Sequence, residues 1–295
     1  MKKKLIMVGI LLFIMVGISA FLTYRYVRYH DTWTLTQYAD DSGNQGMFYT
    51  LKNNYDGYFI IVDGGWPDNE AKVRQVISDN GGVVDAWFLT HYHTDHVEAF
   101  NAIAANPDGI VIKKIYATPL DKKYFLKVAK EWDNVESYQR FCDVTKNMTN
   151  LSYPSRGDKI TLDGLQVTFF NSYDKTLIHN SGDIPNNDSL VFKISGKKDS
   201  ILFLGDVHDK KLGQYLLTTY QDALDAEYVQ AGHHGNNSLP VSFYEELDMR
   251  IMFFDAPEWL MTGEDYSAKD LQQWCNNQGM KTYDFRTAPN CFSFR

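Results

Sequence analysis

The sequence predicts an α/β fold for residues 33 to 295, preceded by one membrane-spanning helix. Short, continuous apolar runs that end in Gly, Asp or His predict buried strands. Longer segments between these runs carry apolar residues at helical spacing, so we expect helices that cover the sheets. An uncharged apolar run near the N-terminus predicts the membrane helix.

The N-terminus predicts a membrane anchor. Residues 1–4 form a basic segment, and residues 5–24 form an uncharged apolar run. About 20 apolar residues are enough to span a bilayer. The alternative is a signal peptide cleaved at Ala20, but the run is longer than the roughly 7 to 15 residues of a usual signal core. We therefore expect the segment to remain as an uncleaved anchor or uncleaved signal.

The charges beside this run predict its orientation. Three lysines precede it, and Arg25 and Arg28 follow it within a juxtamembrane segment, residues 25–32. The lysines favour a cytoplasmic N-terminus, and the two arginines weaken that asymmetry. We expect a single-pass protein of the cell membrane whose one domain, residues 33–295, lies outside the cytoplasm.

Charge and cysteine content narrow the classes of function. The net charge is −8, and residues 1 to 32 contribute +4 (five basic residues and one acidic), which leaves −12 for the domain. An acidic domain binds polyanions poorly, so nucleic acid is a possible but disfavoured partner. The three cysteines, Cys142, Cys275 and Cys291, have no CxxC spacing and indicate neither a zinc knuckle nor a disulfide framework.

Four apolar runs predict buried strands that each lead into a residue able to bind a metal. They are residues 59–62 before Asp63, 86–89 before a histidine cluster, 201–204 before Gly205 and Asp206, and 228–231 before Gly232, His233 and His234. We expect these strand ends to converge at one sheet edge. The neighbouring glycines permit tight turns and close backbone approach.

Between these strands the sequence predicts helices, a hairpin and loops. Helices are expected over 97–105, 121–141, 210–224 and 267–278, the last with Ser267 as N-cap and Gly279 as its stop. In the second helix Tyr124, Phe125, Val128, Trp132 and Val135 form an apolar stripe, which we assign to the core and to no cofactor. Early strands and a turn at 41–44 are expected within 33–51, a hairpin over 159–170, and a long loop over 171–188.

The segment from Leu89 to His96 predicts a metal site. It places His91, His93, Asp95 and His96 within six residues, although the whole chain has only eight histidines. In an extended segment alternate side chains share a side, so His91 and His93 point together. Asp95 and His96 open the next element and can turn toward a second ion.

The strand-end residues together resemble the metallo-β-lactamase superfamily. The matching features, in chain order, are Asp63, the cluster from His91 to His96, Asp206 and the pair His233-His234. Asn186-x-x-Ser189-Leu190-Val191, Leu204-Gly205-Asp206 and His233-His234-Gly235 resemble the hydrolase domain of ComEC-type competence proteins and its extracellular relatives, which include nucleases and a choline-phosphate esterase. The resemblance covers roughly residues 33 to 295 and implies a metallo-β-lactamase-like αββα sandwich with its site at one edge of the two sheets.

The resemblance also implies a role for each site residue. The first zinc would be held by His91 and His93, and the second by Asp95, His96 and either His233 or His234, with Asp206 bridging the two ions. Asp63 would orient a ligand or the bridging water by a hydrogen bond. The candidate catalytic residues are therefore Asp63, Asp95, Asp206 and His233.

One position departs from the usual superfamily pattern. Asn186 stands where a histidine on the first zinc is usual, so the number of ions, one or two, stays open. His179 and His208 could act as auxiliary ligands, and Asn186 and these two histidines could instead contact substrate. Zinc is the expected metal, with manganese as the alternative.

These features predict an exported, membrane-anchored, zinc-dependent phosphodiesterase. Zinc lowers the pKa of a bound water to about 7, so a zinc-bridged hydroxide would be the nucleophile. The substrate would be an extracellular phosphodiester: a cell-envelope polymer, a phosphorylated head group or nucleic acid. The alternatives are ester, lactone or amide hydrolysis, as in β-lactamases, and a non-catalytic accessory protein that binds through the same fold.

Overall fold

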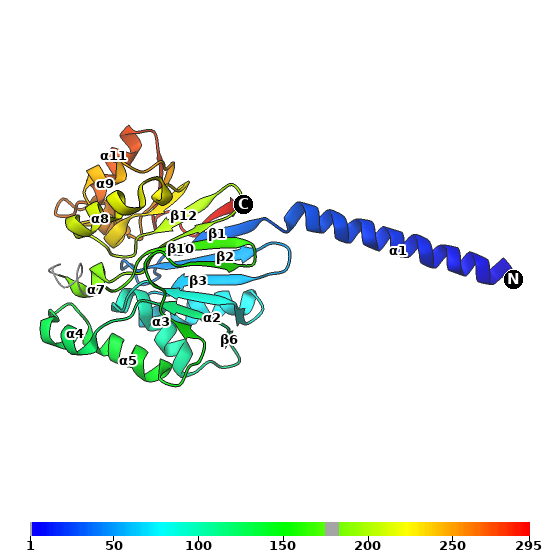
Figure 1. Ribbon diagram of the computed structural model, residues 1–295, viewed down its shortest axis with the longest axis horizontal. Helices are drawn as coiled ribbons and strands as arrows, with labels where there is room; N and C mark the ends of the chain where they lie inside the picture. Colours follow the sequence, from blue (N-terminus) through cyan, green and yellow to red (C-terminus); the bar gives the residue numbers. More distant parts are fainter. Residues whose placement is uncertain (1, 175–182) are drawn as a thin grey trace.

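The computed structural model describes residues 2–174 and 183–295. Over these residues the strands form two seven-stranded sheets and a small two-stranded one. Figure 1 shows the two large sheets side by side in the middle of the domain, with helices outside them and the long helix α1 (Lys2–Tyr29) extending from one end. The predicted αββα sandwich is confirmed.

The first sheet brings the N-terminal half of the domain together with the last strand of the chain. In spatial order it contains β16 (Asn290–Phe294), β1 (Trp33–Gln37), β2 (Phe48–Asn53), β3 (Phe59–Asp63), β5 (Ala86–Leu89), β7 (Ile115–Ala117) and β8 (Leu151–Ser152). Its strands β3, β5, β7 and β8 run parallel, so their carboxyl ends lie at one edge. The two-stranded sheet pairs β4 (Val83–Val84) with β6 (Val111–Ile112).

The second sheet comes from the C-terminal half. Its order is β15 (Lys281–Tyr283), β14 (Ile251–Phe253), β13 (Tyr228–Gln230), β12 (Ser200–Phe203), β11 (Val191–Ser195), β10 (Leu165–Asn171) and β9 (Lys159–Leu162). The hairpin β9–β10 turns at Asp163 and Gly164, both with positive φ, as the Asp-Gly signal predicts. Strands β12 to β15 run parallel and carry their ends to the same edge as the first sheet's site residues.

Helices cover both outer faces. The first sheet is covered by α2 (Glu70–Asp79), α3 (Thr94–Ala105), α4 (Lys122–Val128) and α5 (Val135–Thr145), and the second by α8 (Lys210–Tyr220), α9 (Val241–Tyr244), α10 (Glu258–Thr262) and α11 (Ala268–Asn277). The short helix α7 (Ile184–Asn187) precedes β11, and 3-10 turns occupy η1 (Pro67–Asn69), η2 (Gln221–Leu224) and η3 (Gly232–Gly235). The predicted helix over 210–224 is thus α8 continued by η2.

Strand alternation separates the core into three layers of buried side chains. In β12, Ile201 and Phe203 face the first sheet, whereas Leu202 faces the helices. In β3, Ile60 and Val62 face the second sheet and Ile61 faces α3. Both faces of each large sheet are therefore buried, which is why these strands are continuous apolar runs in the sequence.

The single helix predicted over 121–141 is wrong. The chain forms α4 and α5 instead, and Asp133 and Asn134 separate them because their side chains accept backbone hydrogen bonds from Lys130 and Ser137. Trp132, which we assigned to the core, lies between the two helices and is 66% exposed. The apolar spacing in the sequence continues through Asp133 and Asn134, but the hydrogen bonds of these two side chains end one helix and begin the next.

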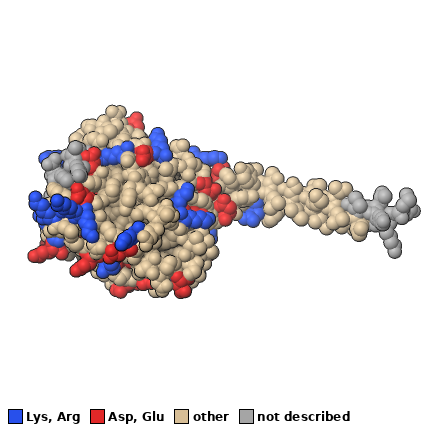
Figure 2. All heavy atoms as spheres, turned by 60° about the horizontal axis from the view of Figure 1, so that its bottom comes forward, with Lys and Arg blue, Asp and Glu red and all other residues tan. Residues whose placement is uncertain are grey.

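The N-terminal helix α1 carries the predicted membrane-spanning segment. Residues Ile10–Tyr29 are long and apolar enough to cross a bilayer, and no part of that window is buried against the domain. Figure 2 shows the described part of α1 as an almost uncharged rod until it meets the body. Length and composition are compatible with an anchor or a signal segment.

Packing between the sheets is expected to dominate the stability of the domain. The ring of Phe88 in β5 stacks on Tyr116 and Phe192 with centroid distances of 4.9 and 4.7 Å. Phe88→Ala should lower the free energy of unfolding by roughly 3–5 kcal/mol, because it leaves a cavity between the sheets. Urea unfolding of the full chain in neutral detergent measures this. Leu126→Ala is the control; Leu126 is 52% exposed on α4, and its loss should cost less than about 0.5 kcal/mol.

Candidate metal centre

The site forms where strands from both sheets end. Asp63 is the last residue of β3, His91 follows β5, Asp206 follows β12, and His234 follows β13. Two sheets that lie face to face therefore contribute side chains to one edge of the sandwich. The convergence expected from the strand-end pattern is observed.

Histidine and carboxylate side chains form two groups with the spacing of metal ligands. One contains His91, His93 and Asp206, and the other contains Asp95, His96 and His234, with ligand atoms within 4.8 Å of one another in each group. Helix α3 begins at Thr94, so Asp95 and His96 lie in its first turn, whereas His91 and His93 precede it. Two adjacent ions could be held in this way, one by each group.

Asp206 lies between the two groups. Its Oδ2 is 3.8 Å from His91 Nε2 and 3.3 Å from His234 Nε2, and its Oδ1 is 3.4 Å from His96 Nε2. The backbone N–H of Asp206 donates to Ser189 Oγ, which fixes the start of this turn. One carboxylate is thus within reach of histidines from both groups, as a bridging ligand requires.

Asp63 orients the histidines from behind. Its carboxylate is fully buried and accepts hydrogen bonds from the Thr90 N–H, the Thr90 hydroxyl and His96 Nδ1, the last at 2.8 Å. Because His96 Nδ1 donates here, Nε2 is left as the free ligand atom facing Asp206. The Thr90 hydroxyl also lies 3.2 Å from His91 Nδ1. Asp63 itself is not in either ligand group.

The two adjacent histidines of η3 point in different directions. His234 Nδ1 is 3.1 Å from the Asp255 carbonyl oxygen, and its Nε2 is 3.1 Å from Asp95 Oδ2. His233 Nδ1 is 2.5 Å from the Asn236 carbonyl oxygen, and His233 lines the cleft beside the site. Both residues have left-handed φ angles, 51° and 56°, so the chain turns sharply between them. His234 therefore belongs to a ligand group, whereas His233 is in neither group and lines the cleft.

His93 has a partner that the sequence did not reveal. Its Nε2 is 3.2 Å from Asp133 Oδ1 in the loop between α4 and α5. Burial lowers the pKa of His93, but the Asp133 hydrogen bond and the nearby carboxylates of Asp95 and Asp183 raise it by more. Because Nε2 contacts Asp133, Nδ1 is the ring nitrogen of His93 that remains available to bind a metal.

The donor set fits a divalent metal. The Nε2 atoms of His91, His96 and His234 and the Oδ1 of Asp206 are buried and, in the part of the chain that the structure describes, make no well-directed hydrogen bond, although oppositely charged site atoms lie 3.1 to 3.8 Å away. Burial lowers the pKa of His234, yet Asp206 and Asp95 raise it to about 10. The carboxylates of Asp95 and Asp206 therefore stabilise a positive charge beside His234. Metal cations bound to neutral imidazoles would supply that charge.

The auxiliary residues are placed as follows. Asn186 in α7 lines the cleft, donates to Asp183 Oδ2, and keeps a buried Oδ1 without a partner among the described residues. His208 Nδ1 lies 3.2 Å from the Asp206 carbonyl oxygen, and its ring is 5.0 Å from that of His233. Neither residue belongs to a ligand group. His179 lies outside the described residues.

A cleft of about 520 Å³ opens over both groups. Its lining combines site residues with side chains from several loops: Gln45, Trp66, His93, Thr94, Asp95, Trp132, Asp183, Asn186, Asp206, His208, His233, His234 and Asn237. No Lys or Arg side chain belongs to this lining, as far as the structure describes the chain. Trp66 is held by a hydrogen bond from its Nε1 to the Gln45 carbonyl oxygen, whereas Trp132 stands largely free at the rim.

Sequence reasoning missed several residues that support the site. Thr90 carries no motif, although it directly precedes the cluster. Asp133 lies 40 residues from its partner His93, and no local pattern joins them. Asp255 could have been found, because it ends the buried run Ile251–Phe253 and Phe254 just as Asp63 ends its own. Its carboxylate accepts hydrogen bonds from Tyr49 and Gln37, while its carbonyl oxygen faces His234.

Comparisons with known proteins agree with this fold. A family model described as "Metallo-beta-lactamase superfamily" matches residues 44–208. The metallo-beta-lactamase fold protein YhfI from Bacillus subtilis is similar in structure, with a TM-score of 0.55, 12% identity, and coverage of 89% of this chain and 99% of that one. CmlA, a diiron β-hydroxylase from Streptomyces venezuelae, has a TM-score of 0.54 at 11% identity, and the match covers 89% of this chain and 54% of CmlA. No curated protein matches in sequence.

The two histidines of η3 should behave differently when replaced. His234→Ala should lower the metal content of the purified full chain by about one ion, because it removes a nitrogen directed at Asp95 and Asp206. His233→Ala should leave the metal content unchanged. Elemental analysis by mass spectrometry measures both. Equal loss in the two variants would contradict the assignment of His234 as the ligand.

The orienting role of Asp63 gives a second expectation. Asp63→Asn should weaken metal affinity by about 10- to 100-fold, because an amide no longer holds His96 in one tautomer. Competition with a chromogenic chelator measures the affinity. Asp85→Asn is the matched control: Asp85 is also a buried carboxylate bonded to a backbone N–H, that of Phe59, but it is outside both ligand groups. A similar loss of affinity in the control would mean that the effect is one of stability.

Proposed function

Because the chain belongs to the metallo-beta-lactamase superfamily, we propose that it is a membrane-anchored, metal-dependent phosphodiesterase that acts outside the cytoplasm. The observation that carries the proposal is the position of Asp206, whose carboxylate lies between two histidine groups at the floor of one cleft. Two divalent ions bound there would supply Lewis acidity toward a substrate oxygen and an acidified water near neutral pH. Zinc suits the histidine-rich donor set, and manganese or iron would be the alternatives.

The protein's own groups then orient the reaction. His91, His93 and Asp206 would hold one ion, and Asp95, His96 and His234 the other. Asp63 keeps His96 in the tautomer with a free Nε2. His233, whose Nδ1 is engaged by the Asn236 carbonyl oxygen, is placed to hold or deliver a proton through Nε2 at the leaving oxygen.

The charge of the cleft favours a diester over a polyanion. A phosphodiester carries one negative charge at the reacting centre, which the bound cations can neutralise. A chain of phosphates would need a basic track, and the described lining of the cleft contains no Lys or Arg. His208 and His233 are the two histidines of the described lining that belong to neither ligand group, and burial lowers the pKa of His233.

The position of the cleft supports a substrate away from the bilayer. Asn186, which lines the cleft, belongs to α7, and Figure 1 shows α7 and α4 at the end of the domain opposite to α1. If α1 spans the membrane, the cleft faces outward. A single phosphodiester that joins uncharged groups of the cell envelope fits this placement better than a lipid head group of the same bilayer. The exposed ring of Trp132 at the rim offers a surface on which a sugar ring could stack.

Turnover of a simple diester tests the proposal. The full chain in neutral detergent, loaded in turn with zinc, manganese and iron, should hydrolyse bis-p-nitrophenyl phosphate. Asp206→Asn should lower kcat/KM by at least about 100-fold, because Asp206 is shared by both groups. Asp222→Asn, an exposed carboxylate in η2, is the control and should retain activity.

Other results would favour the alternatives. Faster hydrolysis of a chromogenic cephalosporin than of the diester would indicate an amide hydrolase. Absence of turnover on both substrates with every metal, while the metals still bind, would indicate an accessory binding protein.

A further inference from the structure

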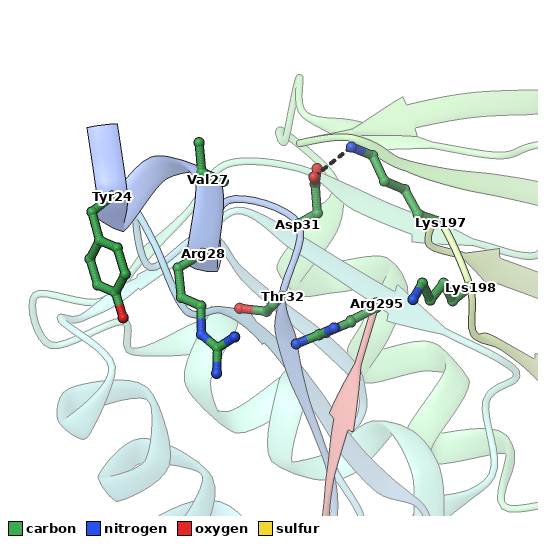
Figure 3. Close-up of a pocket in the computed structure, with 8 residues that line it drawn as sticks. All are labelled: Tyr24, Val27, Arg28, Asp31, Thr32, Lys197, Lys198 and Arg295. Carbon is green, nitrogen blue, oxygen red and sulfur yellow. Dashed lines mark hydrogen bonds and ion pairs between the residues drawn. The ribbon is translucent and has the colours of Figure 1, made fainter. Parts of the chain in front are cut away.

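A second, basic pocket lies at the opposite end of the molecule, where α1 meets the domain. It has a volume of about 340 Å³, and its lining includes Arg28 from α1, Asp31 and Thr32 from the linker, Lys197 and Lys198 from the β11–β12 turn, and Arg295 after β16. Figure 3 shows Arg28, Thr32, Arg295 and Lys198 next to one another along the pocket, with the ion pair of Asp31 and Lys197 beside them. Four cationic side chains and one carboxylate therefore meet at this point.

Close backbone packing builds this pocket. The backbone N–H groups of Lys198 and Asp199 both donate to the Arg295 carbonyl oxygen, and the Arg295 N–H donates to Asp199 Oδ2. Gly196 permits the approach, because a Cβ there would lie 2.4 Å from the Arg295 carbonyl carbon. The turn and the last strand are thus locked together, which sets Lys198 beside Arg295.

The basic side chains near this junction fall into two kinds. Lys197 pairs with Asp31 at 2.5 Å, and Arg25 donates to the Tyr55 carbonyl oxygen and lies over the Tyr55 ring. The side chains of Arg28, Lys198 and Arg295 are exposed and have no hydrogen bond or ion pair within residues 2–174 and 183–295. Because the Asp31 carboxylate of the lining is paired with Lys197, these three other cations repel one another, and a bound anion would offset that repulsion.

The pocket continues onto an exposed, mostly apolar side of α1. This side carries Val16, Ser19, Ala20 and Thr23, and it shares Tyr24 and Val27 with the basic pocket. A ligand that filled both would carry a negative head and an apolar tail. The uncharged run of α1, residues 5–24, ends at Tyr24, where lipid head groups would lie if this run spans a bilayer.

The short connection keeps the pocket at that depth. Helix α1 ends at Tyr29 and β1 begins at Trp33, so three residues separate the helix from the sheet. His30 and Thr32 are tied down as well, since the His30 carbonyl oxygen accepts from Asn53 Nδ2 and the Thr32 hydroxyl donates to the Tyr29 carbonyl oxygen. The domain cannot move far from the membrane surface on this tether.

From these observations we propose that the junction of α1 and the domain is a binding site for an anionic phospholipid. Its phosphate group lies among Arg28, Lys198 and Arg295, and an acyl chain lies along the apolar side of α1 beside Val16 to Val27. The inference rests on the proposed membrane anchor and is independent of the proposed hydrolysis. The lipid fixes the base of the domain on an anionic membrane surface.

Lipid binding to the full chain tests this site. The chain in neutral detergent is titrated with dioctanoyl phosphatidylglycerol, dioctanoyl phosphatidylcholine or glycerol 3-phosphate, and bound ligand is counted by native mass spectrometry. We expect phosphatidylglycerol to bind more tightly than the other two. Each of Arg28→Gln, Lys198→Gln and Arg295→Gln should weaken its affinity by about fivefold, the factor expected for one basic residue at an anionic membrane surface.

The controls separate this site from general attraction and from other ligands. Lys123→Gln with Lys146→Gln removes two exposed lysines of the domain far from the junction and should leave the affinity unchanged. Equal binding of phosphatidylcholine would overturn the proposal, as would equal losses in this control. Equal binding of glycerol 3-phosphate would replace the lipid with a soluble anion.

Failure of this site can be told apart from failure of the anchor. In reconstituted vesicles, a chain without a true anchor is released by alkaline carbonate. A chain with an anchor but no lipid site stays inserted and shows no preference for phosphatidylglycerol.

Discussion

The buried carboxylate of Asp63 is the constraint on which the arrangement of the site depends. A buried ion is costly unless its oxygens are satisfied, and here three donors from Thr90 and His96 meet both oxygens. Two of these donors belong to Thr90, so the end of β5 is tied to the end of β3, and His91 leaves that point in a fixed direction. The third fixes His96 on the first turn of α3. A single side chain thus sets two strand ends and one helix start.

This arrangement explains why much of the site could be predicted from sequence. Asp63 and Asp206 each follow a buried apolar run. A strand buried on both faces needs such a continuous apolar sequence. Asp95 and His96 lie together with His234 in the group separate from His91 and His93, and both belong to the first turn of α3, which starts at Thr94. Strand ends and helix starts of this kind can be predicted because they depend on residues that are close together in the sequence.

The remaining features depend on contacts that no local signal encodes. His233 and His234 have the same chemistry, and their different directions arise from two successive left-handed residues followed by Gly235. That glycine is required, since a Cβ would lie 2.4 Å from the ring of Phe254, a residue of the next strand region. The Asp133 contact with His93 likewise has no local signal: it joins the loop between α4 and α5 to the cluster, and in the sequence Asp133 lies within an apparently continuous apolar stripe.

Charge is distributed unevenly along the length of the molecule. The domain from residue 33 has a net charge of −12, the cleft lining contains no Lys or Arg among the described residues, and Arg28, Lys198 and Arg295 gather at the base beside α1. Near an anionic bilayer the base is attracted and the rest of the domain is repelled, so the charge distribution favours an upright orientation. A domain of this length has a radius of gyration of roughly 18 Å, so its far end would lie about 40 Å from the surface of a bilayer that α1 spans. If α1 spans a bilayer, the tether of only three residues would keep the cleft away from the head groups, and a substrate of the proposed activity would have to extend outward to reach it.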